Sequence, residues 1–435
     1  MKRTVFIVFA IVCSYVLSAQ TISLYFPHFA GVEYDFYVFQ GTTNDTIQQG
    51  AIGDDGRLTL TIPNQYKNYR GMSRWLLRNG GGLDFAINGE SFSVSCTEAN
   101  PNDDNIIYEG SKENRFTNAY YARQQALFQK LEALNGMQRA YEKETEHPIY
   151  SLLKTEKAEK DSLFEVLNRE AIESPLYAAQ FQRINDFLNG YPMYRIYDNS
   201  EDPQAQHQAD RARYISEELS MDALYTSGFW KEVITQAAAM YQDSDDFLPA
   251  MINNLNRTKS IVVYEQLAEA LISIFEQYDW KPETEALARF INEDSRIKEP
   301  TGKLQLLLTL FKLGKGNKAP KLTQGKLPKK NTLLVFYESG CNSCENEVLQ
   351  LVANYPLLQE KGYEVISIAA DNDLDIFQSS AETFPWKAKY CDGEGMEGKD
   401  FQNYGVVGTP TLYIIDKKGI IQERAARLVD LGIIN

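Results

Sequence analysis

Two cysteines separated by two residues are the part of this sequence best suited to chemistry. Cys341 and Cys344 follow an apolar run at 332–337 and open an amphipathic stretch at 342–355. This order predicts a buried strand, a turn and a helix, with Cys341 at the helix N-terminus, where unpaired backbone N–H groups and the helix dipole favour a thiolate. We therefore expect Cys341 to be a nucleophile. Cys344, one turn further along, would resolve the mixed disulfide that Cys341 forms.

A zinc site, an inert disulfide and a peroxidase are the alternatives to a redox pair. Zinc would need further ligands, but there is no second Cys-x-x-Cys pair, and the chain's three histidines all lie far away in sequence: His28, His147 and His207. A peroxidase cysteine needs a threonine or serine three residues earlier, where Glu338 stands before Cys341. We expect neither a metal nor a cofactor. The inert disulfide stays open.

A second signal lies before the apolar run 411–415, in Gly408-Thr409-Pro410. Proline removes a hydrogen-bond donor from a strand, so its place here is unusual. A cis peptide bond at Pro410 would account for it. The backbone around Thr409 and Pro410 would then be free to pair with an extended substrate segment. The alternative is an ordinary trans proline that opens an edge strand.

Taken together, these motifs resemble the TlpA/ResA-like branch of the thioredoxin superfamily. The resemblance covers about residues 318–428, including the insertion at 371–392, and implies envelope thiol–disulfide oxidoreductases that are often reductants. It implies Cys341 and Cys344 as the redox pair and Pro410 as the cis-proline. Glu347 matches an acidic residue that tunes or relays protons in some members; an exposed helix glutamate is the other interpretation.

Several residues depart from the family pattern. Gly340 stands where tryptophan usually precedes the first cysteine, and Asn342-Ser343 replaces Gly-Pro or Glu-Pro. Val335 occupies the place of a buried acid in thioredoxin. The dipeptide between the cysteines governs thiolate stability, so the sequence predicts no direction of electron flow.

The sequence pattern divides the chain from residue 20 onward into three regions. Residues 20–110 contain short runs rich in β-branched and aromatic residues at 22–26, 34–39, 58–62, 85–87 and 92–96. They predict an antiparallel β-sandwich-like domain with a hairpin turn at Asn88-Gly89. Residues 111–314 have helical periodicity and predict an α-helical domain. Residues 315–435 alternate strand and helix and predict an α/β thioredoxin-like fold, in which Pro356 should end or kink the first helix.

The N-terminus resembles a secretory signal peptide over residues 1–19. A basic start at Lys2 and Arg3 precedes an apolar run at 4–17 and then Ser18-Ala19. A lipoprotein would use Cys13, which we disfavour because Val12 stands where a small residue is expected. No later stretch is apolar enough to span a membrane. The expected location is the periplasm or cell envelope.

The net charge limits the classes of partner, and two cysteines remain to be assigned. The chain of 435 residues has a net charge of −15, which argues against a nucleic-acid surface. Cys96 and Cys391 are expected to be structural thiols, although a bridge between them stays possible. We expect an exported thiol–disulfide oxidoreductase that exchanges disulfides with envelope proteins and with a redox partner protein. The alternative is a non-catalytic binding or scaffold protein with a vestigial thioredoxin-like domain.

Overall fold

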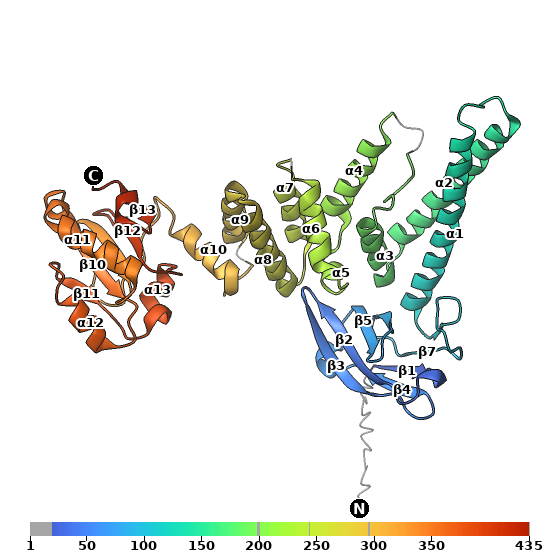
Figure 1. Cartoon of the computed structure of the whole chain (residues 1–435), viewed down its shortest axis with the longest axis horizontal. Coiled ribbons are helices and arrows are strands. Elements are labelled where there is room, and N and C mark those ends of the chain that lie inside the picture. The colour runs from blue at the N-terminus through green and yellow to red at the C-terminus, as the bar shows by residue number, and fades with distance from the viewer. Residues whose placement is uncertain (1–19, 198–200, 243, 295, 435) are drawn as a thin grey trace, which may run out of the picture. The chain divides into compact units, whose positions relative to one another are not determined.

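The computed structural model describes residues 20–197, 201–242, 244–294 and 296–434 (Figure 1). The predicted signal peptide lies outside the described residues. The chain divides into two compact units, and the boundary falls between Ala270 and Leu271. This boundary lies inside one helix, α8 (Ile261–Tyr278). Each unit is described separately, and the domain boundaries at 110/111 and 314/315 stay predictions.

The first unit begins with eight strands in two four-stranded sheets. Their order is β4-β1-β7-β8 in one sheet and β3-β2-β5-β6 in the other. One core contains residues of both sheets, such as Ile22, Phe36, Trp75 and Phe85. In β1 and β2 every second residue is buried, as expected for a strand with one face on a core. The strands are β1 Thr21–Tyr25, β2 Glu33–Gln40, β3 Thr43–Ala51, β4 Arg57–Thr61, β5 Gly71–Leu77, β6 Gly82–Ile87, β7 Phe92–Ser95 and β8 Ile107–Glu109.

Two details of the predicted β-sandwich were wrong. The pair β1 and β7 is parallel, so the arrangement is not wholly antiparallel. Asn88-Gly89 is not a hairpin turn, because the strands on either side lie in different sheets. β6 pairs with β5, whereas β7 pairs with β1 and β8. The residues after β6 therefore carry the chain from one sheet to the other.

Helices follow the strands. The first turn of α1 (Lys112–Ala140) is hydrogen bonded to the sandwich. The Asn114 side chain accepts from Ala86 N at 2.8 Å and donates to Ala86 O at 3.0 Å. These two bonds occupy backbone groups of β6, which is an edge strand. The further helices are α2 Pro148–Glu173, α3 Tyr177–Leu188, α4 Pro203–Arg213, α5 Met221–Tyr225, α6 Trp230–Met240, α7 Phe247–Arg257, α9 Lys281–Asp294 and α10 Gly302–Lys312. None of the described helices is both long and apolar enough to cross a membrane.

The second unit contains a five-stranded sheet in the order β11-β10-β9-β12-β13 (Figure 1). β9, β10 and β11 are parallel to one another, while β12 is antiparallel to both β9 and β13. Successive residues of β9 enter two different cores, with Val335 in one and Phe336 in the other. The elements are β9 Asn331–Tyr337, α11 Asn342–Glu360, β10 Tyr363–Ala369, α12 Leu374–Ala381, β11 Ala388–Tyr390, α13 Lys399–Asn403, β12 Thr411–Ile415 and β13 Ile421–Ala425.

The predicted strands and helices of this unit agree closely with the structure, apart from the end of α11. The helix does not end at Pro356 but continues to Glu360. Proline removes one backbone donor from a helix interior, and this cost is offset by packing. Leu351 and Leu358, on either side of Pro356, are both fully buried.

Candidate active site

Cys341 lies where β9 gives way to α11. It is the N-cap residue of the helix, with φ −83° and ψ 118°, and its carbonyl oxygen accepts from Glu345 N at 2.9 Å. Gly340 before it has φ +79°, a conformation that side chains disfavour. The glycine that replaces the expected tryptophan is therefore required by the local backbone. The Cys341 side chain is partly exposed.

The surroundings of Cys341 favour its thiolate. The Ser343 hydroxyl lies 3.1 Å from Cys341 Sγ, and this hydrogen bond is the main cause that lowers the pKa of Cys341. The backbone N–H of Cys344 and the Cys344 thiol lower the pKa of Cys341 further. These donors lie in the first turn of α11, as expected for an anion at a helix N-terminus.

Cys344 has the opposite environment. Its side chain is fully buried, and burial raises the pKa of its thiol. The Thr409 hydroxyl opposes this effect by hydrogen bonding to the sulfur, which lowers the pKa of Cys344. Cys341 and Cys344 are both free thiols in this structure. The arrangement is that of a reduced pair with one accessible and one protected sulfur.

The second motif lies beside the first. The peptide bond between Thr409 and Pro410 is cis. Pro410 immediately precedes β12, which pairs with β9, and Thr411 Oγ1 donates to Gly408 O at 2.8 Å. The Thr409 contact with Cys344 therefore brings together two motifs that are separated by more than sixty residues in the sequence.

Glu347 is buried, so the interpretation as an exposed helix glutamate was wrong. Only 7% of the residue is exposed, and its Oε2 accepts from Leu428 N at 2.7 Å. A buried carboxylate needs such partners, because desolvation without them is costly. The proton-handling role of Glu347 stays a prediction.

Asp371 is a residue of the site that the sequence reasoning missed. It follows β10, the strand beside β9, and its carboxylate accepts from Ser339 N at 2.9 Å and from the Ser339 hydroxyl at 2.7 Å. These bonds hold the loop that precedes Cys341. An acidic residue two positions beyond a buried parallel strand was the available signal, since the carboxyl ends of neighbouring parallel strands share one edge of the sheet.

The other two described cysteines have separate local partners. Cys391 Sγ donates to Asp371 O at 3.2 Å, and burial raises the pKa of its thiol. Cys96 is buried in the sandwich, and its Sγ donates to Asn105 Oδ1 at 3.2 Å. Both are free thiols in the structure, and the bridge between Cys96 and Cys391 stays an open alternative.

A hollow of about 250 Å³ adjoins the loop that precedes Cys341. Its lining comes from that loop, from α11 and from α12, and includes Glu338, Glu345 and Leu349. Leu349 is 65% exposed. The surface next to the cysteine pair thus combines two carboxylates with apolar side chains.

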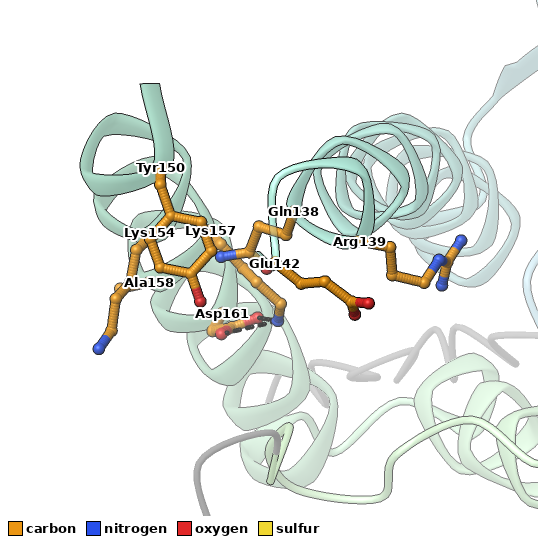
Figure 2. A pocket seen from close by; sticks show the side chains of 8 residues that line it. All are labelled: Gln138, Arg139, Glu142, Tyr150, Lys154, Lys157, Ala158 and Asp161. Carbon is orange, nitrogen blue, oxygen red and sulfur yellow. Dashed lines mark hydrogen bonds and ion pairs between the residues drawn. The ribbon is translucent and has the colours of Figure 1, made fainter. Parts of the chain in front are cut away.

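A second hollow, of about 350 Å³, lies in the first unit between the end of α1 and the start of α2 (Figure 2). Figure 2 shows the ion pair in which Lys157 Nζ and Asp161 Oδ2 are 3.2 Å apart. Arg139, Glu142 and Lys154 also line it, so the hollow carries charges of both signs. This mixture favours no one class of ligand.

Comparison with known proteins finds similarities for the region around the cysteine pair. Residues 309–424 match the model of the AhpC/TSA family. The thiol-disulfide oxidoreductase ResA of Bacillus thuringiensis is 33% identical over 95 residues, which are 22% of this chain and 54% of that protein. The C-terminal region is therefore similar to the AhpC/TSA family and to ResA-type thiol–disulfide oxidoreductases.

Two further proteins are similar to this chain over about a quarter of its length or less. Bovine nucleoredoxin is 30% identical over 95 residues, which are 21% of this chain and 22% of that protein. A solved thiol-disulfide oxidoreductase from Bacteroides fragilis has 21% identity, covers 25% of this chain and 89% of its own, and gives a TM-score of 0.22. The chain spans about half the length of the ResA relatives it matches. The sequence matches support an oxidoreductase.

Proposed function

We propose that this chain is an exported thiol–disulfide oxidoreductase that exchanges disulfides with protein substrates through Cys341 and Cys344. The observation that carries the proposal is the contrast between the two sulfurs. Cys341 is accessible and has a lowered pKa, whereas Cys344 is buried and has a raised pKa. A buried sulfur cannot meet the disulfide of a folded protein, so the first attack falls to Cys341.

The proposed reaction has two exchange steps. The Cys341 thiolate attacks one sulfur of the substrate disulfide, a bond forms between them, and the second substrate sulfur leaves as a thiolate that takes up a proton. Cys344 then loses its proton and attacks Cys341 Sγ. This forms the Cys341–Cys344 disulfide and releases the first substrate sulfur as a thiolate. Two electrons pass to the substrate, and the same steps in reverse would oxidise it.

Other residues would support these steps. We assign Pro410 and Thr409 to substrate binding, because an extended segment can pair with backbone groups of the loop that they form. The Thr409 hydroxyl, which hydrogen bonds to the Cys344 sulfur, would also stabilise that thiolate during the second step. We assign Glu347 to proton transfer, because it is a buried carboxylate one helical turn beyond Cys344.

The surface around the pair fits protein substrates. Four large apolar side chains of α11, α12 and the segment before the cis peptide are about half or more exposed: Leu349, Leu374, Ile376 and Val407. Exposed apolar side chains that gather at one place mark interaction sites. We infer that substrates dock there through apolar contacts.

The proposal also covers the location of the protein in the cell and the region upstream of the thioredoxin-like domain. Residues 1–19 would direct export to the periplasm or cell envelope, where disulfides persist. The protein would act on envelope proteins and exchange electrons with a redox partner protein. The sandwich-like domain at 20–110 and the helical domain at 111–314 would be separate from the thioredoxin-like domain at 315–435.

Replacing Cys344 with alanine tests this function directly. Cys344→Ala should accumulate mixed disulfides through Cys341 in the envelope, because no thiol remains to release the substrate. Non-reducing electrophoresis and mass spectrometry would identify the captured proteins. Cys391→Ala is the matched control and should trap none. If Cys344→Ala traps no more than the control, the mechanism is wrong and the non-catalytic scaffold is favoured.

A further inference from the structure

The thioredoxin-like domain has a groove that its redox chemistry does not use. The groove has a volume of about 640 Å³ and is lined by two segments, 318–329 and 417–419. Backbone hydrogen bonds hold the segments together, from Ala319 N to Gly419 O at 2.9 Å and from Ile421 N to Asn317 O at 2.8 Å. The groove is therefore framed by paired backbone rather than by loose loops.

The rim of the groove is strongly basic. Six of its lining residues are lysines, and all six are exposed: Lys318, Lys321, Lys326, Lys329, Lys417 and Lys418. They stand out in a chain with a net charge of −15, since residues 301–337 contain eight lysines and no aspartate or glutamate. The groove is thus a basic site on an acidic protein.

Little within the described chain neutralises these charges. None of the six lysines forms an ion pair among the described residues. Asp416 faces Lys418 and has its pKa lowered, chiefly by the N–H of Ile420 and in part by the lysine charge. Two lysines just outside the groove do find partners, Lys315 with Glu423 at 3.5 Å and Lys330 with Glu364 at 3.4 Å.

The floor of the groove is apolar. Ala319 and Leu322 are buried in the domain core, and Pro320, Leu327 and Pro328 are only partly covered. A lysine rim over such a floor offers charge to acidic groups and apolar surface to the residues between them. In an extended segment, successive side chains point in opposite directions. One strand can therefore direct acidic side chains to the lysine rim and apolar side chains to the floor.

We propose that this groove binds an extended segment of a partner protein in which acidic and apolar residues alternate. The charge of the rim complements such a segment, and the hollow shape fits a chain that lies in it. A membrane or a nucleic acid would present a wide negative surface, which the acidic remainder of the protein would repel beyond the patch. A short acidic segment would meet only the lysines.

The groove lies away from the cysteine pair. β12 begins next to Pro410 and ends at Ile415, two residues before Lys417. Its five residues span about 15 Å along the sheet. A segment bound among the lysines would therefore leave Cys341 accessible. The groove would hold a partner in place while redox exchange proceeds at the other end of the strand, and its binding can be tested without any redox activity.

Binding of a labelled peptide to the full chain tests the proposal. The probe is a fluorescein-labelled peptide of roughly ten residues that alternates glutamate with leucine, followed by fluorescence anisotropy. The groove variant is Lys321→Glu with Lys326→Glu. The matched control is Lys130→Glu with Lys231→Glu, which makes the same change of net charge at exposed lysines of α1 and α6.

The proposal predicts saturable binding that weakens at least tenfold in the groove variant and less than about twofold in the control. A peptide with glutamine in place of glutamate should bind at least about tenfold more weakly. Three results would overturn the proposal: no binding up to about 1 mM peptide, equal loss in both variants, or binding to phosphatidylglycerol vesicles but not to the peptide.

Discussion

Ser343 lies between the two cysteines, and its hydroxyl shares a hydrogen bond with the sulfur of the first, Cys341. Its hydroxyl is 3.1 Å from Cys341 Sγ and is the main cause of the lowered pKa. The serine hydroxyl thus adds to the stabilisation of the Cys341 thiolate that the backbone N–H groups of α11 provide. The Asn342-Ser343 dipeptide therefore helps to set the reactivity of the site.

We expect Ser343→Ala to raise the pKa of Cys341, because the thiolate loses a hydrogen bond while the neutral thiol loses little. Alkylation of Cys341 by iodoacetamide at pH 7 should slow by about two- to tenfold, and its pH profile should move to higher pH. Mass spectrometry of the alkylated peptide gives the rate. Ser379→Ala, an exposed serine on α12, should change neither. An unchanged pH profile for Ser343→Ala would show that the Ser343 hydroxyl does not stabilise the Cys341 thiolate.

The sequence could identify those residues of the site that have a local signature. Cys341 and Cys344 stand at a recognisable strand–helix junction, and the expected cis bond at Pro410 is confirmed. The contact of Thr409 with Cys344 and the anchoring of Ser339 by Asp371 could not be predicted, because each joins segments that only the folded sheet brings together.

Within α3 of the first unit, Asp186 is a carboxylate buried among three helices. It accepts hydrogen bonds from Gln124 at 2.9 Å and Gln182 at 3.0 Å, and the Tyr120 hydroxyl is 3.5 Å away. Burial raises the pKa of Asp186 from 3.8 to about 6. Because the folded state binds this proton more tightly than the unfolded chain does, the stability that Asp186 contributes is present at low pH and is lost as pH rises through about 6.

Asp186→Asn should therefore remove a pH-dependent destabilisation. We compare the free energies of unfolding of the variant and the native protein at each pH. Between about pH 4 and about pH 7.5, the difference should shift in favour of the variant by roughly 1–3 kcal/mol. Urea denaturation of both proteins across this range measures the difference. If the two curves of stability against pH run parallel, Asp186 titrates as an ordinary surface carboxylate.

At the level of elements, strands marked by apolar alternation or by a continuous apolar run were predicted, whereas β3, β5 and β8 were missed. β3 reads Thr-Asn-Asp-Thr-Ile-Gln-Gln-Gly-Ala and none of its residues is buried, so its pairing with β2 leaves no periodic signal. β8 has three residues, too few for a pattern. The helix α11 continued past Pro356 because tertiary packing outweighed a local preference.

For the whole molecule, the separation into two units predicts an independent redox domain. Both cores of the C-terminal sheet consist of residues between Leu313 and Ile434. α10 adds contacts, since a side chain at Gly405 would meet Thr309 and Leu310. A fragment of residues 300–435 therefore contains what the cysteine pair needs to fold.

This fragment should keep the reactivity of the full chain. We expect the alkylation rate and pH profile of its Cys341 to match those of the full chain within about twofold. The comparison uses the same iodoacetamide assay on both proteins, with circular dichroism to confirm folding. A folded fragment whose Cys341 reacts about tenfold more slowly would show that the upstream residues shape the site.

The most direct test of the account is a redox titration of the full chain against glutathione buffers, with alkylation and peptide mass spectrometry at each potential. We expect Cys341 and Cys344 to be oxidised together in one two-electron step and to form a disulfide with each other. Cys96 and Cys391 should stay free thiols throughout. A disulfide from Cys341 to another cysteine, or no disulfide at Cys341 under oxidising conditions, would contradict the assignment of the pair.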